Sequence, residues 1–283
     1  MKVGMRIPVI RDFDCDSRAI KEEAKKWFSF SQYTDIEALM CILKNRELKA
    51  NCIKNVDDLK EQAYLQPLLD GDEALPYVSC FDYNDKENIP LWNMYSNDKY
   101  GVRIQFVIPQ TGEDFHEVII DKSRFVKGCR SGATPIIFRS QFTTDFDMPY
   151  PYVWVHIVTM PIVYKSDLES ASYQLPASNL INWTTLASVK SEDWNFQNEV
   201  RIVADFQHTD SGIKDNVEAV EIPNFDYLLI PIDFSKLKKI VITFSPWMQE
   251  QTKQIVAESI KQLDLDCAYA TENSQFDKLI RRK

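Results

Sequence analysis

A carboxylate and a guanidinium stand two residues apart in the stretch SEDWNFQNEVRIVADF, residues 191–206. The alternation of apolar and polar residues from Phe196 to Phe206 predicts a β-strand. Side chains two residues apart share one face of a strand, so Glu199 and Arg201 are expected side by side. The pair is either a solvent-exposed ion pair worth about 0–1 kcal/mol or part of a working face inside a cleft.

A second group of candidate residues lies where a strand is expected to pass into a helix. Phenylalanines alternate with serines just before residue 32, which predicts a strand. Thr34 and Glu37 have the spacing of a capping box, which predicts a helix that starts at Asp35 and ends near Asn45. Tyr33 and Thr34 are then at a strand-to-helix junction, where binding sites are often built.

Two aromatic residues follow in a short predicted helix at 88–98, which has Pro90 in its first turn. Trp92 and Tyr95 are three residues apart and therefore share one face of this helix. Packing in the core or at its rim is the ordinary interpretation of such a pair. An aromatic wall of a binding site is the alternative.

The remaining elements suggest a mixed α+β fold with strands in the middle and short helices around them. A strand–helix–strand unit is expected at 238–270, with Ser245 as helix cap and Pro246 at the first helical position. Further strands are predicted at 77–81, 100–108, 116–120 and 152–158, and further helices at 17–28 and 178–190.

The length of 283 residues suits a single domain. We expect its core at 28–270, an N-terminal extension at 1–27 and a basic tail at 271–283. The tail holds KLIRRK, the densest basic cluster of a chain whose net charge is −9. An acidic chain binds nucleic acid poorly by charge alone, although a local basic groove would still allow it.

Composition also indicates where the chain works. No apolar run reaches the roughly 20 residues that span a membrane, and no signal peptide is recognisable. Six scattered cysteines without a CxxC pair are typical of reduced thiols in a cytoplasmic protein. Three histidines far apart make a metal site improbable, so no metal is expected.

Common catalytic and phosphate-binding motifs are missing from the sequence. It contains no GxxxxGK[ST], GxGxxG or GxSxG pattern. The segment KGCRSGAT at 127–134 could bind an anion through backbone N–H groups, but a surface turn is the more frequent meaning of such a segment. Cys129 in this segment has basic neighbours, yet no histidine is obviously paired with it.

Three segments in this order carry a resemblance: QYTDIEALMCILKNRELKAN (32–51), YVSCFDYNDKENIPLWNMYSNDKYGVRIQF (77–106) and VKSEDWNFQNEVRIV (189–203). Together they resemble an uncharacterised bacterial family known only as a domain of unknown function. The layout of that family in turn is similar to the ADP-ribosyltransferase superfamily. This implies a split mixed and antiparallel β-sheet core of ADP-ribosyltransferase-like type, with the C-terminal β-α-β unit belonging to it.

The resemblance also implies an activity and a set of site residues. It implies an enzyme that uses NAD⁺ and transfers ADP-ribose to RNA, DNA or protein, such as the toxin of a toxin–antitoxin or phage-defence system with an antitoxin partner. The catalytic carboxylate would be Glu199, because an ionised carboxylate beside the ribose stabilises the positive charge that forms as nicotinamide leaves. The residues that would bind NAD⁺ are Tyr33, Thr34, Trp92, Tyr95 and Arg201.

Within that pattern, two positions differ from the family. The family motif W-x-Y-E-x-E reads WNFQNE here, so Gln197 replaces a glutamate, and Asp57 is the nearest match to F-N-D-P. A binding module without catalysis, for a nucleotide, a nucleic acid or a protein, is therefore a second hypothesis. A third is a Mg²⁺-dependent nuclease or hydrolase that uses the acidic cluster Asp145–Asp147.

Overall fold

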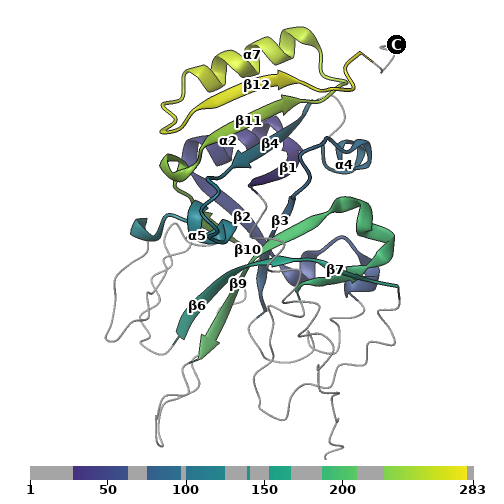
Figure 1. The fold of residues 1–283 in the computed structure, drawn as a ribbon, viewed down its shortest axis with the longest axis vertical. Helices are drawn as coiled ribbons and strands as arrows, with labels where there is room; N and C mark the ends of the chain where they lie inside the picture. Colours follow the sequence, from purple (N-terminus) through teal and green to yellow (C-terminus); the bar gives the residue numbers. More distant parts are fainter. Residues whose placement is uncertain are drawn as a thin grey trace, which may run out of the picture.

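The computed structural model describes residues 28–62, 75–96, 100–124, 139–140, 153–166, 187–208 and 226–278. They form a ten-stranded sheet, a two-stranded sheet and a few helices (Figure 1). The strands of the large sheet are β1 (Ser29–Asp35), β2 (Glu47–Cys52), β3 (Tyr77–Asp82), β4 (Gly101–Val107), β5 (Arg139–Ser140), β6 (Val153–Pro161), β9 (Glu199–His208), β10 (Tyr227–Pro231), β11 (Lys239–Phe244) and β12 (Tyr269–Asn273). The small sheet pairs β7 (Val163–Lys165) with β8 (Val189–Ser191), and the α-helices are α2 (Ile36–Asn45), α4 (Ile89–Tyr95), α5 (Phe115–Ile119) and α7 (Glu250–Lys261).

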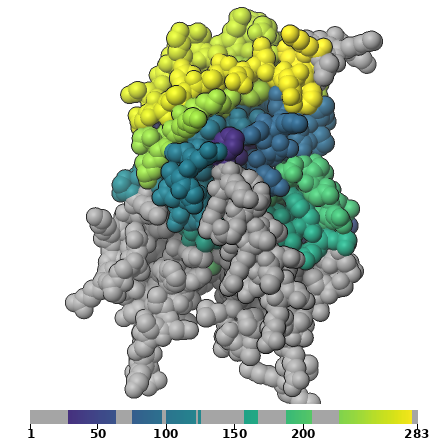
Figure 2. All heavy atoms as spheres, in the orientation of Figure 1, coloured from purple at the N-terminus to yellow at the C-terminus, as the bar shows by residue number. Residues whose placement is uncertain are grey.

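The prediction of a mixed α+β fold is confirmed. The pairs of the large sheet are antiparallel except for β11 with β12, which are parallel and joined through α7. This β11–α7–β12 unit confirms the strand–helix–strand prediction for 238–270. It lies at the top of Figures 1 and 2, whereas β6 and β9 lie in the lower half of Figure 1.

Strand β3 is the place where the large sheet divides. Strand β9 pairs with every residue of β3. On the other edge of β3, strand β2 pairs only with Tyr77 and Val78, and strand β1 pairs only with Asp82. Among the described residues no strand pairs with residues 79–81 on that edge, so β1 and β2 diverge and leave an opening in the sheet.

A side chain spans this opening in place of a strand. Nε2 of Gln32 donates to the carbonyl oxygen of Cys80 over 2.9 Å and to Oγ of Ser79 over 3.1 Å. The backbone acceptor of Cys80 is therefore satisfied although β1 has turned away from β3. Specific hydrogen bonds therefore stabilise the opening in the sheet.

Helix α2 covers the sheet next to the opening through an apolar stripe. Leu39, Ile42 and Leu43 recur at helical spacing and are buried. The predicted start of this helix was wrong by one residue. Asp35, not Thr34, is its N-cap, with Oδ1 2.8 Å from the backbone nitrogen of Ala38. Both residues still pair in β1, Thr34 with Val102 and Asp35 with Gly101, and Asp35 is the one that directly precedes the first helical residue.

The end of α2 also differs from the prediction. Arg46, not Asn45, takes the left-handed conformation, with φ of 55°. Its backbone N–H donates to the carbonyl of Ile42, which closes the last turn. Asn45 remains helical and its side chain lies at the rim of the cleft described below.

Another predicted element was wrong in type. The strand expected at 116–120 is helix α5, because Asp114 and Glu117 form a capping box and Phe115, Val118 and Ile119 are its buried stripe. Apolar residues that follow one another closely fit either element, and the cap decided between them.

The helix predicted to start after Ser245 begins only at Glu250. Oγ of Ser245 accepts from the backbone N–H of Trp247 and forms a turn that separates strand from helix. Of the helix predicted at 178–190, residues 187–190 lie instead in a turn and in β8, and the rest lies outside the described residues. Residues 17–27, 127–134 and 145–147 also lie outside them.

Gly101 stands where β4 passes close to the end of α4. A Cβ at this position would lie 2.0 Å from the Cβ of Ser96, a fully buried residue, and 2.5 Å from its carbonyl oxygen. Because the backbone itself must move, we expect Gly101→Ala to lower the free energy of unfolding by about 1–3 kcal/mol. Urea unfolding measures this, with Gln262→Ala at an exposed site as the control. A wild-type midpoint for Gly101→Ala would contradict the close approach.

Candidate functional site

The opening in the sheet leads into a cleft of about 820 Å³. Its walls come from the diverging strands β1 and β3, from α2 and β2, from Leu91 and Tyr95 of α4, and from residues of β8, β9 and β10. Among the predicted site residues, those that line it are Tyr33, Thr34, Tyr95, Glu199 and Arg201. The structure thus brings these five residues together at one cleft, although they come from three separate parts of the chain.

Glu199 stands at the side of the cleft as the first residue of β9. The predicted strand at 196–206 begins later than expected, because residues 192–197 form a 3₁₀ turn that the side chain of Ser191 caps. Asn198 then takes a left-handed conformation, with φ of 45°. This kink turns the chain into β9 and places the Glu199 side chain toward the cleft.

Glu199 and Arg201 form an ion pair, but it is not the exposed pair that surface strands usually carry. Nε of Arg201 lies 2.6 Å from Oε1 of Glu199, and the two residues are 1% and 4% exposed. The interpretation as a solvated pair is wrong, because β9 is an inner strand with β3 and β6 on its two edges, and Glu61 and Lys190 contact the pair. A buried ion pair keeps its strength only if its remaining polar atoms are also satisfied.

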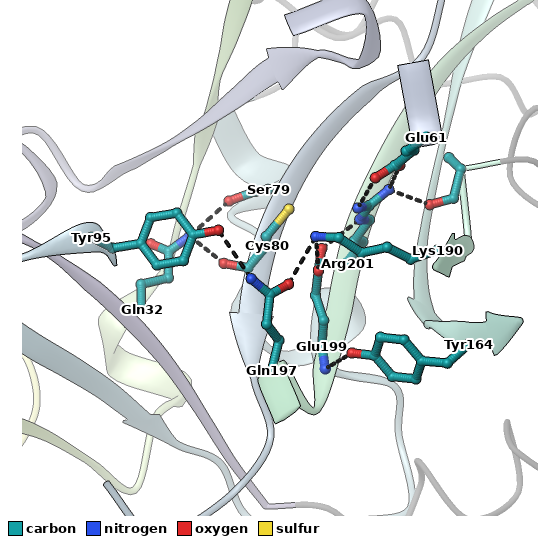
Figure 3. A network of polar contacts seen from close by, with 11 residues as sticks. Gln32, Glu61, Ser79, Cys80, Tyr95, Tyr164, Lys190, Gln197, Glu199 and Arg201 are labelled. Carbon is teal, nitrogen blue, oxygen red and sulfur yellow. Dashed lines mark hydrogen bonds and ion pairs between the residues drawn. The ribbon is translucent and has the colours of Figure 1, made fainter. Parts of the chain in front are cut away.

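A second glutamate satisfies the guanidinium. Both terminal nitrogens of Arg201 donate to Glu61, over 2.5 Å and 3.1 Å, and Nη1 also donates to the carbonyl of Ala187 (Figure 3). Glu61 is fully buried. Four of the five N–H donors of Arg201 are thus used within the protein, and its contribution to the site is to hold Glu199.

The other oxygen of Glu199 is held by a lysine. Nζ of Lys190 lies 3.0 Å from Oε2 of Glu199 and 2.8 Å from Oε1 of Gln197, and it stands 5.0 Å above the ring of Trp194. The amide nitrogen of Gln197 then donates to the hydroxyl of Tyr95 over 3.1 Å. One chain of contacts therefore connects Glu61 to the aromatic wall of the cleft (Figure 3).

These neighbours fix the protonation states in the cleft. Burial alone would raise the pKa of Glu199, but the charges of Arg201 and Lys190 and hydrogen bonds from Arg201 and Cys80 lower it to about 2. Burial raises the pKa of Tyr95 to about 12, against a hydrogen bond from Gln197. At neutral pH the cleft therefore holds an ionised carboxylate and a neutral phenol.

Tyr33, which lines the cleft, packs against the buried ring of Trp92. Their rings meet edge to face with centroids 4.8 Å apart, and the Tyr33 hydroxyl accepts from the backbone N–H of Asn88. Trp92 is fully buried, does not line the cleft, and donates from Nε1 to Glu87 over 2.9 Å. Its position is that of a packing residue, whereas Tyr33 reaches the cleft.

Several residues of the site were missed by reasoning from the sequence. Glu61 and Gln32 carried no signal at all, since their partners lie far away in the chain. Lys190 was interpreted as a helix end. A buried arginine needs an acidic partner, which would have pointed to a residue such as Glu61. That argument could be made only after the structure had shown that Arg201 is buried.

Asp82 at the narrow end of the opening titrates near neutrality. Burial raises its pKa to about 7, an N–H bond from Asn84 and the charge of Arg103 oppose this, and the charge of Asp85 adds to it. Because the folded-state pKa lies above the ordinary 3.8, the contribution of Asp82 to stability is full below about pH 4 and is lost as the pH rises through 7.

We therefore expect the stability advantage of Asp82→Asn over the wild type to grow between pH 4 and 7 and to level off above it. Urea unfolding of both proteins at several pH values measures the difference. A difference that is independent of pH over this range would contradict the raised pKa.

The described residues contain no cluster of three or more side chains placed to bind a metal ion, and none of their helices is long and apolar enough to cross a membrane. Searches of protein-family models, curated proteins and solved structures found no match to the chain. The similarity to ADP-ribosyltransferases therefore stays a prediction from the sequence.

Proposed function

We propose that the chain is an NAD⁺-dependent enzyme of the ADP-ribosyltransferase type. It would break the bond between nicotinamide and ribose and pass ADP-ribose to an acceptor. The observation that carries the proposal is an ionised glutamate, Glu199, at the side of a cleft of about 820 Å³ that also contains an aromatic residue, Tyr95. A split sheet with Tyr33 and Thr34 on an early strand and a carboxylate on a late strand is the arrangement that the resemblance implies.

The chemistry needs a carboxylate that stays negative without an external base. Positive charge develops on the ribose as nicotinamide leaves, and a fixed negative charge close to it lowers the barrier. Arg201 and Lys190 each occupy one oxygen of Glu199 and keep the group ionised and oriented. A carboxylate has about four lone-pair positions, so positions remain for a ribose hydroxyl.

The direct test is incubation of the purified chain with NAD⁺ labelled in the adenylate part, alone and with a bacterial lysate. We expect release of free nicotinamide, and label that becomes attached to a macromolecule. Separate digestion with protease, RNase and DNase identifies the class of acceptor. Absence of nicotinamide release in buffer and in lysates of several bacteria, from a chain shown to be folded, would refute the proposal.

Tyr95 is assigned the stacking surface for nicotinamide. A ring contact of this kind contributes about 0.5–1.5 kcal/mol, so we expect Tyr95→Ala to raise the Kd for NAD⁺ about 3–10-fold. Tyr95→Phe keeps the ring, loses only the hydrogen bond to Gln197, and should bind NAD⁺ as the wild type does. Isothermal titration measures both. Equal Kd values for wild type and Tyr95→Ala would remove the stacking role.

One observation favours a non-catalytic binding module as a second candidate. Both oxygens of Glu199 already accept hydrogen bonds from protein cations, and Gln197 stands where the related pattern has glutamate. Such a module would bind NAD⁺ or another nucleotide in the same cleft and release no nicotinamide. The titration and the nicotinamide assay together separate the two candidates.

A toxin role would follow from the enzymatic activity. The chain would act in the cytoplasm, modify a macromolecule there, and be held in check by an antitoxin protein. Induced expression in bacteria tests this: growth should stop with the wild-type chain and continue when the catalytic carboxylate is removed. Growth arrest that is independent of Glu199 would point to another cause of toxicity.

A further inference from the structure

The charges that line the cleft are unevenly divided. The acidic side chains of the lining are Asp35, Glu37, Glu47, Asp57, Asp82 and Glu199, whereas the basic ones are Lys49, Lys190 and Arg201. A cleft lined mainly by one sign of charge attracts the opposite sign and repels its own. The charge balance of the wall therefore bears on what can enter.

The basic groups of the lining are already engaged by the protein. Arg201 and Lys190 hold Glu199, and Arg201 is also bound by Glu61. Nζ of Lys49 lies 4.6 Å from the centroid of the Tyr227 ring, at the far end of the cleft over β2 and β10. Around Glu199, the described wall thus offers no unengaged cation, so the diphosphate of NAD⁺ would lie toward Lys49, and the acidic end would receive the positively charged nicotinamide and the acceptor.

Two acceptors without partners lie at the narrow end of the opening. Asp82 and Ser31 face one another where β3 and β1 meet, and they are 4% and 1% exposed. Oδ2 of Asp82 and Oγ of Ser31 have no hydrogen-bond partner within the described structure. Asp82 also stands directly opposite Glu199 in the pairing of β3 with β9, so both side chains leave the same face of the sheet.

This is the side of the sheet on which a ligand would meet Glu199. An unsatisfied carboxylate oxygen is completed by a group that donates N–H bonds, and a positively charged donor satisfies it best. Asp57 adds a further negative charge close by, since its field and that of Glu199 both act on the Tyr95 hydroxyl. The end of the cleft that contains Glu199 is therefore suited to a cationic group rich in N–H donors.

Resting on the proposed transferase activity, we infer that the acceptor is a positively charged side chain of a protein, arginine or lysine, and not a nucleic acid. The acceptor atom must reach the ribose carbon beside Glu199, which brings it into the acidic end of the cleft. A nucleic acid would carry its phosphates past Asp57 and Glu37, whereas a guanidinium or ammonium group is attracted by both.

The transfer is balanced without a further reactant. The acceptor nitrogen first gives one proton to solvent, which frees the electron pair that the new bond needs. This nitrogen then forms a bond to the ribose carbon as the bond from that carbon to nicotinamide breaks. The electron pair of the broken bond passes to the ring nitrogen, and nicotinamide leaves as a neutral molecule.

The test offers matched acceptors to the full chain with labelled NAD⁺. They are a peptide with one arginine and one lysine among neutral residues, the same peptide with glutamine at both positions, and single-stranded RNA and DNA of mixed sequence. We expect label on the first peptide at least about 10-fold above the second, and none on the oligonucleotides. Label on RNA or DNA, or equal label on both peptides, would overturn the inference while leaving the transferase in place.

A binding arm separates this inference from failure of the proposed function. The affinity of each peptide is measured by fluorescence anisotropy without NAD⁺, so its result does not depend on nicotinamide release. We expect the cationic peptide to bind more tightly than the glutamine peptide and to weaken about 3–10-fold with Asp57→Asn. Asp264→Asn, which removes an exposed aspartate outside the cleft, should leave binding unchanged. Equal binding of the two peptides, or equal effects of the two variants, would overturn the inference.

Discussion

Nicotinamide release should fall by about 10²–10³-fold when Glu199 is replaced by glutamine, because this removes the negative charge that stabilises the developing cation. The change keeps the size of the side chain and one hydrogen-bond acceptor for Arg201 or Lys190. NAD⁺ affinity is therefore expected to stay close to that of the wild type. Nicotinamide release, followed by chromatography, and isothermal titration with NAD⁺ measure the two effects.

The control for this variant is Glu258→Gln, which makes the same chemical change at an exposed position of α7. It should release nicotinamide as the wild type does. Because Glu199→Gln leaves two buried cations with less compensation, its folding has to be checked by circular dichroism. If it is unfolded, Glu199→Asp keeps the charge, moves it by one methylene group, and should still lower the rate. Wild-type rates in folded Glu199→Gln would remove Glu199 from the catalytic role.

The largest effect on stability is expected at Glu61. Glu61→Gln should lower the free energy of unfolding by about 3–5 kcal/mol, because it leaves the buried guanidinium of Arg201 without one of its two counter-charges. Glu61 and Arg201 are 0% and 1% exposed, so water cannot replace the lost partner. Urea unfolding of the variant and the wild type measures the difference.

A carboxylate that is itself exposed is the matched comparison for this loss. Glu250→Gln removes a largely exposed carboxylate 3.6 Å from the buried Lys253, which keeps its closer partner Asp277, and we expect no change beyond the error of the measurement. Similar losses for Glu61→Gln and Glu250→Gln would show that water reaches Arg201 and replaces the lost partner. The pair Glu61→Met with Arg201→Met tests the same point, since removing both charges should be less damaging than removing one.

Elements with a strong local pattern were predicted well from the sequence. The alternation in residues 100–108 gave a strand whose Val102, Ile104 and Phe106 are all buried, as expected. The strands at 77–81 and 152–158 and the C-terminal strand–helix–strand unit are also present. In each case one residue period dominates over the whole length of the element.

Predictions failed where a single side chain decided between two backbone conformations. Asp35 displaced Thr34 as the cap of α2, and Asp114 turned an apolar segment into helix α5. A capping bond contributes about 1 kcal/mol, which is enough to move a boundary but leaves no periodic trace. The left-handed conformation of Asn198, which ends the 3₁₀ turn before β9, is likewise decided at a single residue.

The candidate site was predictable only in part. Glu199 and Arg201 share a face by strand periodicity alone, and this prediction is confirmed. Their burial was not predictable, because it depends on β9 being an inner strand between β3 and β6 and on the side chains that pack over its face. Glu61 and Gln32 act through partners that only the tertiary fold brings together.

The contact between Glu61 and Arg201 joins positions 140 residues apart and has a consequence for how the chain acquires its site during synthesis. A nascent chain that has not reached β9 contains Tyr33, Tyr95 and Glu61 but neither the carboxylate nor its guanidinium partner. Since long-range contacts form late and together, the cleft and the global fold should appear in one cooperative step. Any activity of this cleft would thus begin only after β9, which contains Glu199 and Arg201, has left the ribosome.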